Sequence, residues 1–128
     1  MLMPWGNMSP DYALSMIYHV VTSAEWALVS KGRHYSPPAF SNDGFIHCCK
    51  EEQLEYVGKC HFRGRQGLVV LCIDPTMVAA PIKYEDLTGE NMLFPHIYGV
   101  LNTDAVKSVV AFQPRADGTF EIPAEIRG

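Results

Sequence analysis

Basic residues and long hydrophobic runs are both scarce in this sequence, and each scarcity argues against a class of protein. Ten Lys and Arg residues stand against fourteen Asp and Glu residues in a chain of 128, giving a formal net charge of −4 at pH 7. Because phosphate neutralisation dominates nucleic-acid affinity, bulk binding of DNA or RNA is disfavoured. No apolar run approaches the roughly 20 residues that cross a bilayer, and no Lys or Arg precedes the first apolar residues. We therefore expect a cytoplasmic protein without a membrane partner.

Short motifs of several common enzyme classes are also missing. The sequence has no GxGxxG, GxxxxGK(S/T), GxSxG or HExxH segment, which argues against Rossmann sites, phosphate loops, α/β-hydrolases and zinc proteases. The cysteines form no CxxC pair and have no secretory context, so we expect reduced thiols. They are Cys48, Cys49, Cys60 and Cys72.

The length suits one domain preceded by a short tail. Residues 1–15 contain Pro4, Gly6 and Pro10 without any periodic pattern, so we interpret them as an N-terminal tail. Residues 16–128 then form a single domain. Met16 stands directly before the first predicted strand and could itself be the start of translation.

Within that domain, short strands are mixed with two main helices. Predicted strands cover Met16–Val21, Phe45–Cys49, Leu68–Ile73, Ile82–Tyr84, Ile97–Tyr98, Val106–Phe112 and Thr119–Ile122, the last two forming a hairpin. Predicted helices cover Ser23–Lys31, opened by a capping box of Thr22 and Glu25, and Lys50–Phe62. The all-apolar run at 68–73 predicts a central strand covered on both faces. Because strands and helices do not alternate regularly, we predict an α+β fold with a small split sheet, antiparallel or mixed.

Three of the five histidines occur in similar strand settings. His19, His47 and His96 lie in the segments Ile-Tyr-His-Val, Phe-Ile-His-Cys and Phe-Pro-His-Ile-Tyr. Adjacent strands could bring them into one cleft, where imidazole exchanges protons near neutral pH. The alternative for each is a buried histidine satisfied by a backbone carbonyl. We interpret these three as candidate catalytic residues, and His34 and His61 as structural.

A metal site is the competing interpretation of the same region. His47, Cys48, Cys49, Cys60 and His61 are all zinc-ligand types within a short span. However, neighbouring residues of a strand point to opposite faces, and no standard ligand spacing is present. We therefore expect no metal. A nucleophilic pair of Cys49 with His96 or His19 is a further alternative.

Two other residues are candidates for binding a cofactor. Arg63 lies with Arg65 in a Gly-flanked turn, where a guanidinium could hold a pyrophosphate through paired hydrogen bonds, although exposed arginines are ordinary surface residues. Tyr98 lies two residues after His96 and would share its face of a strand, so its ring could stack on a ligand.

Five segments together resemble the bacterial domain of unknown function 952 family. They are Ile17–Val21, Gly44–Cys48, Phe62–Gly64, Leu68–Leu71 and Phe94–Gly99, and the resemblance runs from about Met16 to Pro123. In fold, such proteins resemble the ADP-ribosyltransferase superfamily, whose small split sheet binds NAD in a cleft. The resemblance therefore implies an ADP-ribosyltransferase-like domain with NAD as cofactor and a small nucleotide as ligand.

The resemblance also implies a role for each candidate residue. His19 would contact the ribose and the nicotinamide amide, and His47 with Tyr98 would line the nicotinamide pocket. Arg63 would hold the pyrophosphate, and His96 would act as an acid–base group or a phosphate contact.

The sequence departs from the resemblance at two positions. Transferases often carry a catalytic Glu near the third motif, where this sequence has no obvious equivalent and Glu90, in an irregular segment, is the nearest upstream. Cys49 stands where the family commonly has Ser, so a hydroxyl is replaced by a weaker donor.

The implied reaction is cleavage of the nicotinamide–ribose bond through an oxocarbenium-like state, with the ADP-ribosyl group passed to an unidentified acceptor. Three alternatives stay open. The first is a non-catalytic nucleotide-binding or regulatory module, which the missing Glu favours. The second is an NAD-dependent RNA 2′-phosphotransferase, which the sparse basic residues disfavour. The third is a small metal-dependent hydrolase built on the histidines.

Overall fold

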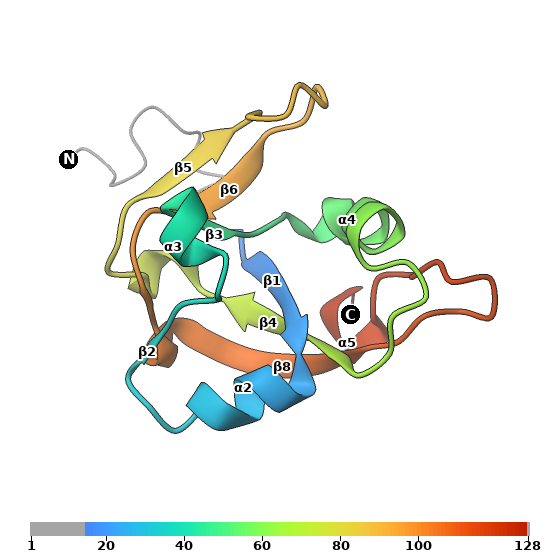
Figure 1. Ribbon diagram of the computed structural model, residues 1–128, viewed down its shortest axis with the longest axis horizontal. Coiled ribbons are helices and arrows are strands. Elements are labelled where there is room, and N and C mark those ends of the chain that lie inside the picture. Colours follow the sequence, from blue (N-terminus) through green and yellow to red (C-terminus); the bar gives the residue numbers. More distant parts are fainter. Residues whose placement is uncertain (1–14, 128) are drawn as a thin grey trace.

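The computed structural model describes residues 15–127, so the predicted tail, residues 1–15, lies outside the described residues except for Ser15. The described chain is a small α+β structure with short strands and few helices (Figure 1). Its strands are β1 (Ile17–Thr22), β2 (His34–Tyr35), β3 (Ile46–His47), β4 (Leu68–Ile73), β5 (Ile82–Glu85), β6 (Phe94–Ile97), β7 (Leu101–Asn102) and β8 (Val106–Phe112). Its helices are α2 (Ser23–Val29), α3 (Phe40–Asp43), α4 (Leu54–His61) and α5 (Ala124–Arg127), with short 3₁₀ turns at Glu51–Gln53, Pro75–Met77 and Thr103–Ala105.

The strands form three small antiparallel sheets. β4 lies between β1 and β8, β6 lies between β3 and β5, and β2 pairs with β7. In Figure 1 the β3–β6–β5 sheet stands above the β1–β4–β8 sheet, and α4 lies beside β1. The predicted α+β class, the antiparallel pairing and the central position of 68–73 are confirmed.

Alternation along the central strands produces a core on each side of the sheet. On β4, Leu71 and Ile73 belong to one buried cluster, whereas Val70 and Cys72 belong to another. β1 divides in the same way, because successive side chains of a strand point to opposite faces. The expectation that 68–73 is covered on both faces is therefore also confirmed.

One pair of residues joins two of the sheets. The backbone N–H of Tyr18 on β1 donates to the carbonyl of Cys49 at 2.8 Å, and the N–H of Cys49 donates back to the carbonyl of Tyr18 at 2.8 Å. Cys49 follows β3, so this isolated bridge attaches the β3–β6–β5 sheet to the β1–β4–β8 sheet. The residues around it form the floor of the site described below.

The first helix begins as predicted, with one change in its capping. The Thr22 hydroxyl accepts a hydrogen bond from the Glu25 N–H at 3.0 Å, which satisfies a free donor of the first turn. The Glu25 carboxylate does not complete the capping box, because it accepts a hydrogen bond from the Tyr35 hydroxyl instead, at 2.9 Å. The helix predicted over 50–62 is divided into a 3₁₀ turn and α4.

The predicted strand Thr119–Ile122 is wrong. Residues 119–122 form no strand, although Gly118 makes the expected turn with φ of 86°. Phe120 stacks on Phe112 at 4.4 Å between ring centroids and lies against Gly58 of α4, where an added Cβ would come within 2.6 Å of its ring. Packing on the helix thus takes this segment away from β8, with which it would have paired.

Within residues 15–127, no helix combines the length and the hydropathy that a bilayer span requires.

Candidate functional site

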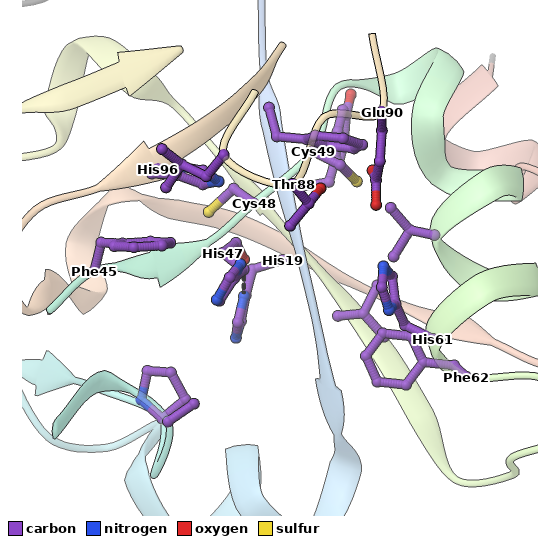
Figure 2. A pocket seen from close by; sticks show the side chains of 17 residues that line it. His19, Phe45, His47, Cys48, Cys49, His61, Phe62, Thr88, Glu90 and His96 are labelled. Carbon is purple, nitrogen blue, oxygen red and sulfur yellow. Dashed lines mark hydrogen bonds between the residues drawn. The ribbon is translucent and has the colours of Figure 1, made fainter. Parts of the chain in front are cut away.

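A cavity of about 380 Å³ opens where the two three-stranded sheets meet α4. Most of the surface of its wall is apolar, as is usual for small-molecule sites, although polar residues also contribute to it. The polar members are Tyr18, His19, His47, Cys48, Cys49, His61, Thr88, Glu90 and His96. Figure 2 shows His19, His47 and His96 gathered at one side, and His61 with Glu90 at the other.

Strand pairing brings two of the predicted histidines together. His47 on β3 and His96 on β6 are register partners, and their ring centroids are 5.5 Å apart in an edge-to-face arrangement. The Phe45 ring stacks on His96 at 4.3 Å and lies 4.7 Å from His47. A flat aromatic group and two imidazoles therefore form one continuous wall.

His96 is held by a carboxylate that lies outside the cavity wall. Its Nδ1–H donates to Oε1 of Glu85 on β5 at 2.9 Å, and the Tyr98 hydroxyl donates to the same oxygen at 2.6 Å. Desolvation opposes the charge of Glu85, but these two hydrogen bonds keep its pKa below the ordinary value. Burial lowers the pKa of His96, against the opposing effect of Glu85. In the neutral ring, the contact with Glu85 thus places the proton on Nδ1.

His19 is buried among protein atoms that use both of its ring nitrogens. Nδ1–H donates to the His47 carbonyl at 2.6 Å, and Nε2 lies 3.0 Å from the Tyr35 hydroxyl, whose single hydrogen serves either Nε2 or the Glu25 carboxylate at 2.9 Å. Burial lowers the pKa of His19. The ring therefore has no nitrogen left for a ligand, and its hydrogen bond fixes the backbone of β3 beside the cavity.

His47 is the most accessible of the three, with 59% of its side chain exposed. Its Nε2–H donates to the Asp43 carboxylate at 2.8 Å, an i, i+4 contact from the end of α3. With Nε2 so engaged, Nδ1 is the hydrogen-bond acceptor that His47 can offer at the cavity mouth.

The cysteines at the cavity are poor nucleophiles. Burial raises the pKa of the Cys48 and Cys49 thiols, and neighbouring acidic groups act in the same direction. Because the thiolate is the reactive form, the geometry gives no support to a nucleophilic pair of Cys49 with His96 or His19. In the described part of the chain, no group of three or more His, Cys, Asp or Glu side chains is placed to hold a metal ion.

The other two predicted binding residues lie outside the cavity wall. Arg63 is in the turn after α4, where its guanidinium donates to the Asp117 carbonyl at 3.3 Å. Tyr98 shares a face with His96, as expected, but reaches the site only through Glu85 and through Phe45, whose ring centroid is 5.2 Å away. The predicted pyrophosphate contact of Arg63 is therefore not adjacent to the histidines.

A family model described as "Protein of unknown function (DUF952)" matches residues 20–109. The chain belongs to this family. His47 and His96 lie within the DUF952 match, and His19 directly precedes it. No curated protein matches the chain.

Solved structures of one bacterial protein share the DUF952 chain's fold. The crystal structure of protein CC0527 from Caulobacter crescentus is 26% identical, with a TM-score of 0.79, over 89% of this chain and 100% of that one. The solution NMR structure of CC0527 is 31% identical, with a TM-score of 0.69, over 81% of this chain and 90% of that one.

Two residues of this DUF952 site, His61 and Glu90, were not among the predicted site residues, although Glu90 was named as the nearest candidate for a catalytic Glu. His61, interpreted as structural, lines the cavity from the end of α4, whereas His34 lies exposed on β2. Glu90 is in an irregular segment, as expected, yet it also lines the cavity. The Asp86 carboxylate accepts hydrogen bonds from the N–H groups of Glu90 and Asn91, at 2.8 and 2.9 Å, and so shapes this segment. An Asp with a Gly three residues later is the sequence signal that could have predicted an ordered turn.

Proposed function

We propose that the cavity binds the nicotinamide end of NAD and cleaves its bond to ribose, passing the ADP-ribosyl group to an acceptor. Support comes from the character of the wall. Among the described residues that line the cavity there is no Lys or Arg, and Glu90 is the one carboxylate. The acceptor nitrogens of His47 and His96 lie on the same wall. Such a site suits a group that is cationic or donates hydrogen bonds, and it disfavours a phosphate.

The nicotinamide of NAD has that chemistry. It is a flat pyridinium cation whose carboxamide carries two N–H donors. The Phe45 ring beside the two imidazoles offers a flat surface of matching size, and aromatic faces attract cations. The phosphates of the bound dinucleotide would then project out of the cavity, and no contact with Arg63 is required.

Glu90 supplies the acidic group that the resemblance to ADP-ribosyltransferases demands. A carboxylate at the cavity wall stabilises positive charge that develops on the ribose when nicotinamide leaves. The third motif lacks the catalytic Glu of that resemblance, and in this proposal Glu90, in the segment between β5 and β6, takes its place. This places the proposed chemistry between Glu90 on one side and His96 on the other.

A binding module without catalysis is the second candidate. It is favoured by the state of the other polar groups, because His19 has both nitrogens engaged and the buried thiols remain protonated. Such a module would hold NAD without turning it over.

Calorimetric titration of NAD, with an assay for released nicotinamide, tests the proposal. We expect saturable binding and release, and Glu90→Gln should lower the release rate by about 10²-fold, the usual size of one electrostatic or acid–base contribution. Glu121→Gln is the matched control, because that exposed carboxylate pairs with Arg115 away from the cavity.

Competition of NAD with its two parts, nicotinamide and AMP, shows which end of NAD binds in the cavity. Free nicotinamide should displace NAD, whereas AMP should not. Binding without release would support the module, and absence of binding at millimolar NAD would overturn both candidates.

A further inference from the structure

His96 has one ring nitrogen without a partner although the residue is almost fully buried. Only 5% of His96 is exposed. Its Nδ1 bonds Glu85, and within residues 15–127 Nε2 has no hydrogen-bond partner. Buried polar atoms in native proteins are nearly always hydrogen-bonded, so an orphan on a cavity wall calls for a donor from a ligand or water.

The surroundings of His96 keep this nitrogen in its accepting form. The Glu85 carboxylate on β5 accepts the hydrogen bond of Nδ1–H, while Tyr98 donates to the same oxygen and holds it in place. Lys83 lies over the Tyr98 ring at 4.7 Å, and its charge contributes to the lowered pKa of Glu85. On the remaining sides are the apolar Phe45 ring and the His47 ring.

We propose that His96 is the base that takes the proton of a hydroxyl acceptor, and that Glu85 is the positioning residue that directs Nε2 towards it. This inference rests on the proposed function and specifies its acceptor class. A hydroxyl is a weak nucleophile until its proton is drawn away, which a neutral imidazole with an open nitrogen does. The acceptor is therefore water or an alcohol.

The step balances without any further reactant. The bond between C1′ of the ribose and the ring nitrogen of nicotinamide breaks, and its electron pair stays on that nitrogen, so the cation leaves as neutral nicotinamide. The acceptor oxygen forms the new bond to C1′. Its proton passes to Nε2 of His96, giving an imidazolium that the Glu85 carboxylate stabilises, and is then released to solvent.

The first test needs no ligand. In protein labelled with ¹⁵N on histidine, the His96 resonances, assigned by their loss in His96→Gln, should show the proton on Nδ1 above the pKa of the ring. Glu85→Gln should lower that pKa and mix the two tautomers, because the charge that holds Nδ1–H is gone. Glu121→Gln should leave both unchanged. A native His96 protonated on Nε2, or a Glu85→Gln spectrum identical to the native one, would overturn the positioning role.

The second test uses NAD and depends on turnover. Glu85→Gln should lower kcat by about 10²-fold with little change in KM, and should shift the acidic limb of the pH profile to lower pH. In ¹⁸O-water, label in the released ADP-ribose identifies water as the acceptor. Unlabelled product that carries added methanol identifies an alcohol, and transfer to an amine or a thiol would overturn the inference.

The two tests separate the two proposals. Loss of NAD binding together with the expected His96 tautomer would reject the nucleotide and keep the Glu85–His96 assignment. NAD cleavage that is unaffected by Glu85→Gln would keep the proposed function and reject the positioning role of Glu85.

Discussion

A buried histidine lies near a glutamate on the β1 side of the cavity and another on the β6 side. Among the described residues, the histidine on the β6 side has a ring nitrogen without a hydrogen-bond partner, whereas the one on the β1 side does not. His19 is 7% exposed and His96 is 5% exposed. On the β1 side, Tyr35 stands between the ring and Glu25, and both nitrogens are used. On the β6 side, Glu85 bonds the ring directly, and one nitrogen is left. Residue type and burial are thus alike, and among the described residues the two histidines differ in whether a ring nitrogen is left without a hydrogen-bond partner.

The largest expected effect is on the β1 side. We predict that His19→Ala lowers the free energy of unfolding by about 3 kcal/mol, because it removes a buried ring and leaves the His47 carbonyl without its donor. The exposed His47→Ala should change it by less than about 0.5 kcal/mol. Urea unfolding measures both. A fully stable His19→Ala protein that no longer binds NAD would show that His19 serves ligand binding and not the stability of the fold.

A matched pair of tyrosines gives the next effect. Tyr35→Phe removes the hydroxyl between His19 and Glu25, so we expect the free energy of unfolding to fall by about 2 kcal/mol, as for other buried hydrogen bonds that lose one partner. Tyr98→Phe should be milder in urea, because its hydroxyl is only part-buried. However, Tyr98→Phe should perturb the His96 tautomer, and Tyr35→Phe should not.

Stability should also depend on pH through both histidines. Burial lowers the pKa of each ring below the usual 6.5. Between the folded-state pKa and 6.5, the histidines therefore bind more protons in the unfolded chain than in the folded chain. Their contribution is fully present above pH 6.5 and is lost as the pH falls towards the folded-state pKa, by at most about 1.4 kcal/mol per pH unit for each ring.

Urea midpoints measured from pH 7.5 to 5 check this prediction. His19→Gln and His96→Gln should each flatten the curve. His34→Gln, at an exposed position, should leave it unchanged. A native curve that rises towards acid pH would contradict the burial argument.

The smallest effect concerns the exposed pair at the cavity mouth. Asp43→Asn removes the ionic contact with His47, whose side chain is 59% exposed, so the free energy of unfolding should change by less than about 0.5 kcal/mol. The ¹⁵N spectrum of His47 should change, because its Nε2–H loses a charged acceptor. An unchanged spectrum would show that the pair does not persist in solution.

The strand positions of the three histidines could be predicted because the pattern that carries them is local. Each histidine follows apolar or proline residues of a short strand, and β1 and β3 overlap the predicted strands. The third strand is displaced, because β6 covers Phe94–Ile97 whereas Ile97–Tyr98 was predicted.

The hydrogen-bond partners of the histidines could not be predicted, because they depend on how strands that are distant in the sequence pair with one another. Glu85 reaches His96 only through the β5–β6 pairing, in which Lys83 is opposite His96. Tyr35 is 16 residues from His19 and belongs to a two-residue strand. The strand predicted at Thr119–Ile122 is absent for a related reason. The contact of Phe120 with α4 outweighs the local preference of these residues for an extended, paired strand.

The paired hydrogen bonds between Tyr18 and Cys49 have a consequence for access to the cavity. They tie the two sheets together at its floor, so the sheets should move as one rigid body, and the amide protons of these two residues should exchange with deuterated water only when the whole domain unfolds. The segment 86–93 has members Leu87, Thr88 and Glu90 in the cavity wall, is held by its own bonds to Asp86, and is joined to the 3₁₀ turn by the Gln53 side-chain amide, which donates to the Leu93 carbonyl at 3.0 Å. A ligand would then enter by displacement of this segment, and its amides should be the ones whose exchange slows when a ligand is bound.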